Sequence, residues 1–206
     1  MIGPDVGRVS GIVLAGGRSS RFGSDKLAAV IGSDTLLERS IAALAMVVDE
    51  IVVVVGPTDE RTIGPIPGRD RPIRIVRDGE AHGGPLVGLL AGLEVVAHPL
   101  VLVVGGDMPD LQPDVLALMV GTLAVDMAAG AVVLRARGEV VPLPAALRTA
   151  AGSEVARSLV LDGERRLRSV FERLPTRILA DGEWRPLDPE GATLRDVDVP
   201  ADLPRD

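Results

Sequence analysis

Short apolar runs alternate with longer amphipathic segments along the chain up to about residue 135. The apolar runs are rich in β-branched side chains, which is typical of strands buried on both faces of a sheet. They predict strands over residues 9–14, 51–55, 73–76, 100–104 and 131–134. The segments between them predict helices over residues 35–48, 86–97 and 113–123. Ser33 or Asp34 is the expected N-cap of the first helix.

The alternation of strands and helices predicts an α/β fold with a Rossmann-like, mostly parallel sheet that has helices on both faces. After residue 135 the alternation weakens, and we expect short strands over residues 139–144 and 177–179 and a short helix over 167–174. The stretch 56–72 is rich in Gly and Pro, which predicts a loop without regular structure. The length of 206 residues suits a single domain spanning 1–206.

Composition narrows the classes of function. Hydrophobic residues make up 47% of the chain, which is enough for a buried core and excludes a disordered protein. The net charge of -7 argues against binding to nucleic acid or to an anionic membrane, because both would repel the protein. The absence of Cys excludes disulfides, cysteine nucleophiles and thiolate zinc sites. With no secretory leader and no apolar stretch of about 20 residues, we expect a cytoplasmic protein.

A glycine-rich, basic segment follows the first predicted strand, at the edge where parallel sheets bind ligands. Residues 14–26 read LAGGRSSRFGSDK. Glycines let the backbone approach a ligand and the basic side chains supply positive charge, so the segment suits a triphosphate. Its spacing matches neither the P-loop nor the dinucleotide fingerprint. Lys26 is the only lysine among 22 basic residues, and its ammonium is a compact partner for phosphate. The alternative is an ordinary surface loop.

Two carboxylates follow other predicted strands. Asp107 lies in the run GGDMP after residues 100–104. Beside an anionic nucleotide its natural role is to bind Mg²⁺, and the alternative is an Asp that opens a turn or caps a helix. Asp78 lies in the run RDGE after residues 73–76, where it could accept hydrogen bonds from a base or a ribose. The bare backbone at Gly84 could pack against a planar ring.

An acidic pair lies in the run RDVDVP at residues 195–200. Asp196 and Asp198 are two residues apart in a segment that is predicted to be extended, so both side chains point to the same side. If the segment folds back to the strand ends, this pair could complete a metal site. A solvated acidic tail is the alternative.

Three runs in order resemble the signature of the molybdenum cofactor guanylyltransferases: LAGGxSxRFGxDK at 14–26, GPLxG at 84–88 and DMP at 107–109. The resemblance implies the three-layer nucleotidyltransferase fold of that family. It also implies transfer of GMP from Mg-GTP to the terminal phosphate of molybdopterin, with release of pyrophosphate. GTP and molybdopterin are then the substrates, Mg²⁺ is the cofactor, and proteins that deliver or accept the cofactor are candidate transient partners. The nucleotide-binding half would span about 9–125 and the acceptor-binding half about 126–206.

The resemblance places the family's GTP-binding residues on Leu14, Ala15, Gly16, Lys26, Asp78 and Asp107, and its magnesium ligand on Asp107. The reading of the residues adds Gly17 and Gly84 to those expected to bind the nucleotide, Arg21 to those expected in catalysis and Asp198 to the expected metal ligands. Those expected to act in catalysis are Lys26, Arg21 and Asp107. The expected metal ligands are Asp107 and Asp198. Arg165, Arg166 and Arg168 are candidate contacts for the pterin phosphate, with a solvated helix face as the alternative.

The chain departs from the family pattern near residue 196. The family typically has Asn-x-Asn-Thr-Pro, whereas this sequence has Asp196-Val-Asp198-Val-Pro200 and contains no Asn. Acidic versions resemble cytidylyltransferases that act on the same cofactor, so the choice between GTP and CTP stays open. Another small-molecule nucleotidyltransferase, acting on a sugar phosphate or phospholactate, is a further alternative. A nicotinamide-dependent oxidoreductase is disfavoured because no Gly-x-Gly-x-x-Gly follows the first predicted strand, and a non-catalytic nucleotide-binding module is disfavoured because Lys26 and Asp107 are both present.

Overall fold

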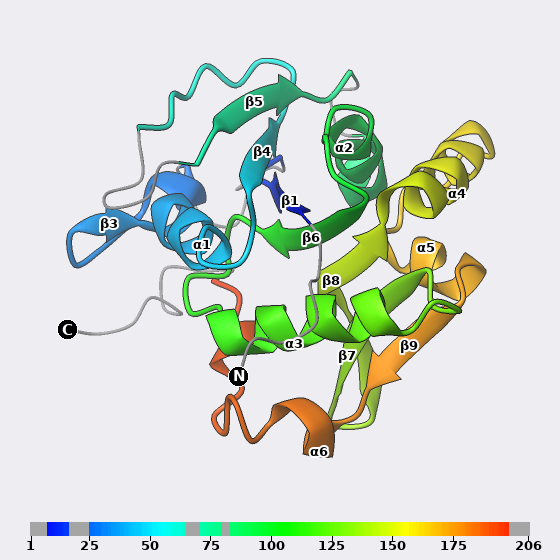
Figure 1. Cartoon of the computed structure of the whole chain (residues 1–206). Helices are drawn as coiled ribbons and strands as arrows, with labels where there is room; N and C mark the ends of the chain where they lie inside the picture. The colour runs from blue at the N-terminus through cyan, green and yellow to red at the C-terminus, as the bar shows by residue number, and fades with distance from the viewer. Residues whose placement is uncertain (1–7, 17–24, 65–70, 80–82, 198–206) are drawn as a thin grey trace.

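The computed structural model describes residues 8–16, 25–64, 71–79 and 83–197 (Figure 1). A seven-stranded sheet with the strand order β5-β4-β1-β6-β8-β7-β9 forms its centre. The strands are β1 Val9–Leu14, β4 Glu50–Val55, β5 Ile73–Arg77, β6 Leu100–Gly105, β7 Ala131–Ala136, β8 Glu139–Arg148 and β9 Thr176–Leu179. Strand β8 runs antiparallel to both β6 and β7, and the other pairs of neighbours are parallel. The predicted mostly parallel sheet is therefore confirmed.

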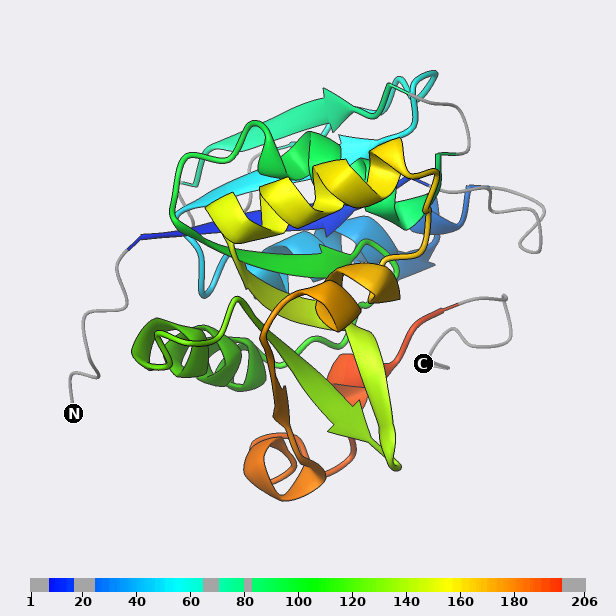
Figure 2. The ribbon, with the colours of Figure 1, turned by 90° about the vertical axis from the view of Figure 1, so that its right-hand side faces the viewer.

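Helices cover both faces of this sheet, which gives the three layers of the predicted fold (Figures 1 and 2). The helices are α1 Leu36–Leu44, α2 Gly84–Leu93, α3 Pro113–Val125, α4 Thr149–Leu161, α5 Arg168–Arg173 and α6 Asp181–Trp184. Side chains of α1 and α3 pack in the core on one face, and those of α2, α4 and α5 pack on the other. None of the helices in the described part of the chain is long and apolar enough to cross a membrane.

The alternation of side chains along the central strands explains their apolar runs. In β4, Ile51, Val53 and Val55 belong to one core and Val52 and Val54 to the other. Successive side chains of a strand point to opposite faces, so a run with helices on both sides is apolar at successive positions.

Short elements precede α1 and explain one wrong prediction. Strands β2 Val30–Ile31 and β3 Asp34–Thr35 form a small antiparallel pair that follows the 3₁₀ turn η1, Lys26–Ala28. Thr35 is the N-cap of α1 because its hydroxyl accepts a hydrogen bond from the Glu38 N–H at 3.2 Å. The Glu38 carboxylate accepts the Thr35 N–H in return, at 2.8 Å, and completes a capping box. The predicted cap at Ser33 or Asp34 was therefore wrong, and α1 ends before residue 48.

The second half of the chain differs more from the prediction. Strand β8 continues to Arg148, beyond the expected 139–144, and α4 was not predicted at all. The buried positions of α4 are Gly152, Ala156 and Leu159. A helix is identified in a sequence by large apolar side chains that recur every three or four residues, and this helix has few of them on its buried face. A second 3₁₀ turn, η2 Ala192–Leu194, lies against β8.

Candidate functional site at the carboxyl ends of the strands

Backbone hydrogen bonds hold the loops that leave β1, β4, β5 and β6 against one another. The Leu14 carbonyl accepts the Gly106 N–H at 3.0 Å, and the Ala15 N–H donates to the Val54 carbonyl at 2.8 Å. The Asp78 N–H donates to the Val55 carbonyl at 3.0 Å. The segments that the sequence singled out after separate strands therefore meet at one edge of the sheet, as expected for a parallel α/β sheet.

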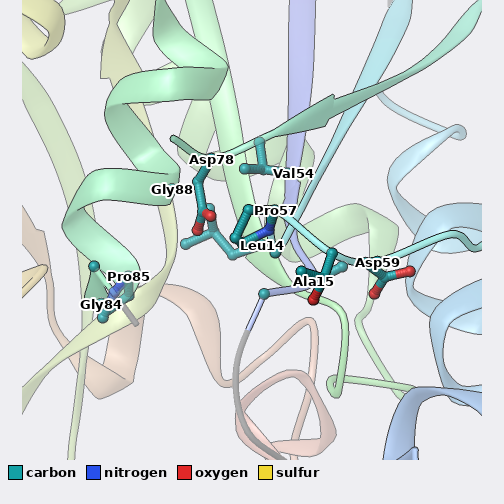
Figure 3. A pocket seen from close by; sticks show the side chains of 13 residues that line it. Leu14, Ala15, Val54, Pro57, Asp59, Asp78, Gly84, Pro85 and Gly88 are labelled. Atoms are coloured by element: carbon teal, nitrogen blue, oxygen red, sulfur yellow. The ribbon is translucent and has the colours of Figure 1, made fainter. Parts of the chain in front are cut away.

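A pocket of about 610 Å³ opens at this edge, between the ends of β1 and β4 and the start of α2 (Figure 3). Its volume lies in the range of small-molecule sites. It is lined by Leu14, Ala15, Gly16, Val54, Gly56, Pro57, Thr58, Asp59, Asp78, Gly83, Gly84, Pro85 and Gly88. The lining contains five of the residues expected to bind the nucleotide: Leu14, Ala15, Gly16, Asp78 and Gly84. The pocket is therefore the place where a base and a sugar could bind.

Asp78 brings a buried carboxylate to the pocket wall. The residue is only 8% exposed. A Cβ atom added to Gly16 would lie 3.5 Å from Asp78 Oδ2 and 3.6 Å from the backbone nitrogen of Gly56. The backbone of the first loop therefore lies close to this carboxylate and to the loop after β4, at distances where a Cβ would make ordinary contacts.

Gly84 has a structural reason to be glycine. Its φ is +79°, and a Cβ atom there would lie 3.0 Å from the carbonyl oxygen of Arg165. The Leu86 N–H donates to the same carbonyl at 3.4 Å. The start of α2 is thus packed directly against the chain at Arg165, so the glycine at position 84 makes room for protein backbone.

Lys26 and Asp107 form an ion pair of 2.8 Å between Nζ and Oδ2. Their side chains are 16% and 29% exposed, so both are partly screened from water. Neither residue is among those that line the pocket, but the hydrogen bond from Gly106 to Leu14 ties the Asp107 loop to its floor. The other carboxylate oxygen of Asp107, Oδ1, lies 2.5 Å from the position of a Gly105 Cβ, so only glycine at position 105 accommodates this carboxylate without a shift.

The Asp107 loop is fastened by α1. The Ser40 hydroxyl lies 3.2 Å from the carbonyl oxygen of Gly106 and 3.0 Å from that of Met108. The Arg39 guanidinium pairs with Asp110 at 3.2 Å. Polar contacts thus hold the chain on both sides of Asp107, at Gly106 and at Met108 and Asp110, and limit how far its carboxylate can move.

The segment before Asp198 folds back to this loop, as the metal-site hypothesis requires. The Val197 N–H donates to the Asp107 carbonyl at 3.1 Å, and Val197 is buried against Leu36. Arg195 pairs with Asp110 at 2.8 Å. The backbone therefore folds back as far as Val197, while Asp196 itself is exposed.

Three of the predicted site residues, Gly17, Arg21 and Asp198, lie outside the described residues, so their roles stay predictions. Among the residues that are described, no group of three or more Asp, Glu or His side chains could hold a metal ion. Asp107 alone still fits Mg²⁺, because this ion commonly binds through one or two carboxylates together with substrate phosphates and water.

The three arginines considered for the pterin phosphate already contact the protein. Arg165 Nη1 donates to the carbonyls of Val160 and Glu164, at 3.2 and 2.9 Å. Arg166 pairs with Glu164 at 2.8 Å, and Arg168 lies 3.7 Å from Glu172. Hydrogen bonds from Arg166, Ser169 and Arg165 hold the pKa of Glu164 far below its usual range. These contacts favour a structural role for the cluster.

Asp59 and Arg61, in the loop after β4, were not predicted from the sequence. Asp59 lines the pocket, and Arg61 Nε donates to its carboxylate at 2.8 Å. Burial alone would raise the pKa of Asp59, but the hydrogen bonds and charge of Arg61 outweigh it and lower this pKa. The loop has no periodic pattern, so no signal in the sequence indicated this pair.

Comparisons with known proteins agree with this geometry. Residues 11–178 match the family described as the MobA-like NTP transferase domain. A probable molybdenum cofactor guanylyltransferase from Chloroflexus aggregans is 32% identical over 198 residues, which covers 95% of this chain and 91% of that protein. A molybdenum cofactor guanylyltransferase from Burkholderia ambifaria is 34% identical, over 82% of this chain and 83% of that protein.

Solved structures show the same fold. Molybdopterin-guanine dinucleotide biosynthesis protein A from Archaeoglobus fulgidus superimposes with a TM-score of 0.73 at 22% identity, covering 94% of each chain. A 4-diphosphocytidyl-2C-methyl-D-erythritol synthase from Anaerococcus prevotii gives a TM-score of 0.73 at 16% identity, covering 97% of this chain and 94% of the other. At these identities the structures support the fold alone.

Proposed function

Since the chain belongs to the MobA-like NTP transferase domain family and is a nucleotidyltransferase, we propose that it transfers GMP from GTP to molybdopterin. The products are the guanine dinucleotide form of the cofactor and pyrophosphate. The observation that carries this proposal is the Lys26–Asp107 ion pair, which lies next to a pocket floored by Leu14 and Ala15. A cation for phosphate and a carboxylate for a metal are thus adjacent, and both are beside a cavity of the right size for a nucleoside.

The pocket supports a definite orientation of the nucleotide. The base and ribose would occupy the space between Ala15, Asp78 and Gly84, where the wall is mostly apolar with one buried carboxylate. The phosphates would then extend toward Lys26. In this arrangement the ammonium of Lys26 leaves Asp107 for a phosphate oxygen and stabilises the charge that builds up on the leaving pyrophosphate.

The reaction needs no covalent intermediate with the protein. An oxygen of the terminal phosphate of molybdopterin attacks the α-phosphorus of GTP, and the bond from that phosphorus to the bridging oxygen breaks to release pyrophosphate. The protein contributes mainly by holding the two reactants in line and by matching their charge. Arg21 would add a second cation to the phosphates, and the backbone at Gly17 would lie along them.

Nucleotidyltransferases of this kind generally use a divalent metal, and we assign Mg²⁺ to Asp107 with Asp198 as a second ligand. When bound, the ion neutralises charge on the phosphates and polarises the reacting centre. The fold-back of the chain at Val197 supports the assignment of Asp198, since the preceding residue already contacts the Asp107 backbone.

An irregularity in β8 supports placing the acceptor on the other side of Asp107. Ala145 pairs with Val103 of β6 and with Val133 of β7, but the next pair along β7 joins Leu134 to Val141. Residues 142–144 are therefore outside the ladder, after the last β6–β8 pair and next to the carboxyl end of β6. This irregularity would form the wall of an acceptor site in the half spanning about 126–206.

Cytidylyl transfer to the same acceptor is the second candidate. It is favoured by the acidic residues at 196 and 198, where the guanylyltransferase family typically has Asn. A carboxylate and an amide differ in charge and in hydrogen-bond donors, so this substitution bears on nucleotide choice or on metal affinity.

The test is magnesium-dependent release of pyrophosphate with GTP and with CTP, measured in parallel with and without molybdopterin. We expect release with GTP only when the acceptor is present. Preference for CTP would overturn the guanylyl assignment and leave the reaction class intact. Release with neither nucleotide would refute the proposed function.

A further inference from the structure

Arg61 joins the wall of the pocket to the segment that carries Lys26. Its Nη2 lies 3.2 Å from Asp25 Oδ2. Its Nε donates to Asp59 Oδ2 at 2.8 Å, and its backbone N–H donates to Asp59 Oδ1 at 2.9 Å. One guanidinium thus links the loop after β4 to the end of the glycine-rich segment.

Asp25 connects Arg61 to Lys26, because it is the N-cap of the turn that begins at Lys26. Its Oδ1 accepts the Leu27 N–H at 3.1 Å and caps the 3₁₀ turn η1, which begins at Lys26. Its other oxygen is the one that faces Arg61. The two oxygens therefore have separate roles: Oδ1 caps the η1 turn, and Oδ2 connects the turn to Arg61. A continuous series of contacts runs from Asp59 through Arg61 and Asp25 to Lys26, and on to Asp107.

The link is charge-assisted, and its Asp59 half is partly buried. The side chains of Arg61 and Asp59 are 18% and 20% exposed, whereas that of Asp25 is 49% exposed. Burial opposes the charge on Arg61, but the hydrogen bond to Asp59 and the charges of Asp25 and Asp59 outweigh it and raise the pKa of the guanidinium. Arg77 Nε also donates to the Asp59 carbonyl, at 3.2 Å. Hydrogen bonds between ionised groups are the stronger kind, and the planar guanidinium fixes their directions.

The charge on Arg61 also matters for a polyanionic ligand. Asp25 and Asp59 bring two negative charges to the side of the proposed phosphate path, where they would repel a triphosphate. Arg61 lies between them and offsets part of this charge.

We propose that Arg61 is a positioning residue for Lys26: its bridge between Asp59 and Asp25 holds the η1 turn so that the Lys26 ammonium faces the phosphates. The inference rests on the proposed function, because that function makes Lys26 the phosphate contact. It also predicts a purely structural effect on Lys26 that exists without any substrate.

Three variants and a control separate positioning from stability. Arg61→Gln removes the bridge. Asp25→Asn keeps an oxygen to cap η1 but removes the charged partner of Arg61. Arg61→Lys keeps the charge but not the planar fork. Arg71→Gln is the matched control, since Arg71 belongs to the same connection between β4 and β5 but pairs at 3.7 Å with Asp49, near the amino ends of the strands.

The first measurement uses Lys26 as its own reporter. Because it is the only lysine in the chain, incorporation of ¹³C-labelled lysine gives a single ε-methylene signal. In Arg61→Gln and Asp25→Asn we expect this signal to move toward that of a free lysine, and in Arg71→Gln we expect it to stay where it is. Loss of stability alone would not move the signal at temperatures well below unfolding.

The second measurement is the steady-state kinetics of pyrophosphate release. We expect Arg61→Gln to lower kcat/KM for GTP by about tenfold, mainly through KM, as the loss of one charge-assisted contact implies. Arg61→Lys should recover part of that loss. The control should behave as the wild type.

The proposal is overturned if the Lys26 signal of folded Arg61→Gln coincides with that of the wild type. Should this variant fail to fold, Asp25→Asn breaks the same bridge, and an unchanged signal there is equally decisive against it. If the wild-type protein releases no pyrophosphate with GTP or CTP, the proposed function fails. The Lys26 signal then still decides whether Arg61 positions the lysine.

Discussion

The ammonium of Lys26 lies 2.8 Å from the carboxylate of Asp107, and this ion pair connects the segment after β1 to the loop after β6. Both loops leave the carboxyl edge of the sheet, next to the pocket. Such a pair is complementary to a metal-bound phosphate, because the ammonium can contact the phosphate and the carboxylate can contact the metal ion. The chemistry of each partner can therefore be tested separately.

Replacing Lys26 by Arg keeps the charge but changes its shape. An ammonium is a compact charge, whereas a guanidinium is a larger planar fork, so its charge would lie at a different position relative to Asp107 and phosphate. We expect kcat/KM for the nucleotide to fall by about tenfold or more, equivalent to about 1.4 kcal/mol. Steady-state assays of pyrophosphate release provide the measurement. Near-normal turnover would show that charge alone is sufficient at position 26.

Replacing Asp107 by Ala should abolish turnover while the protein stays folded. The carboxylate is the proposed metal ligand, and it lies in a loop at the edge of the sheet, outside the two apolar cores, so the fold does not depend on it. Thermal unfolding and pyrophosphate release, measured on the same preparation, test both parts. An Asp107→Ala variant that remains active with Mg²⁺ would contradict the metal assignment.

Replacing Gly84 by Ala should destabilise the protein. A left-handed φ of +79° strains any residue with a Cβ, and the Arg165 carbonyl lies 3.0 Å from that atom. We expect a loss of about 1–3 kcal/mol in the free energy of unfolding, measured by urea denaturation. Gly121→Ala is the control, because a Cβ within α3 meets nothing within 4 Å. That variant should gain roughly 0.5–1 kcal/mol, and equal effects of the two substitutions would rule out the strain.

Glu50 should make stability depend on pH in the acid range. Burial would raise its pKa, but hydrogen bonds from the Ala97 N–H and the Ser10 hydroxyl, together with Arg74, outweigh burial and lower this pKa below the usual 4.5. A carboxylate with a lowered pKa stabilises the fold at pH above its ordinary value, and this stabilisation is lost as pH falls through the lowered pKa.

Glu50→Gln should therefore be less stable than the wild type at pH 7, with a difference that shrinks as the pH falls below about 4.5. Urea denaturation at a series of pH values gives the measurement. Glu154→Gln, at an exposed position on α4, controls for the loss of one negative charge. A difference that stays constant down to pH 3 would contradict the assigned role of Glu50.

The sequence predicts the fold up to about residue 125 well because its central strands are buried on both faces. Runs such as residues 51–55 must be apolar at every position, and this leaves a clear pattern. The capping box of α1 was misassigned because Ser33, Asp34 and Thr35 are all good caps, and only the β2–β3 pair determines which one begins the helix. Helix α4 was missed because two of its three buried positions, Gly152 and Ala156, are held by small residues.

Much of the candidate site follows from the same reasoning, since glycine-rich runs at the ends of neighbouring strands must meet at one edge. The pairing of Lys26 with Asp107 could not be read from spacing, because it depends on the path of the chain beyond the strand end. The bridge that Arg61 forms between Asp59 and Asp25 is harder still to predict. Its partners come from two loops, and a contact between irregular segments leaves no periodic trace in the sequence.

The hydrogen bond from Val197 to the Asp107 carbonyl has a consequence for how the enzyme is made. During synthesis, β1 to β6 leave the ribosome long before Val197 is available, since chains emerge from the N-terminal end. The loop that carries Asp107 can therefore acquire its last backbone contact only after β7, β8 and β9 have been translated. The edge of the sheet that carries the candidate site is therefore completed late in synthesis. By then the part of the chain proposed to bind the acceptor has already been made.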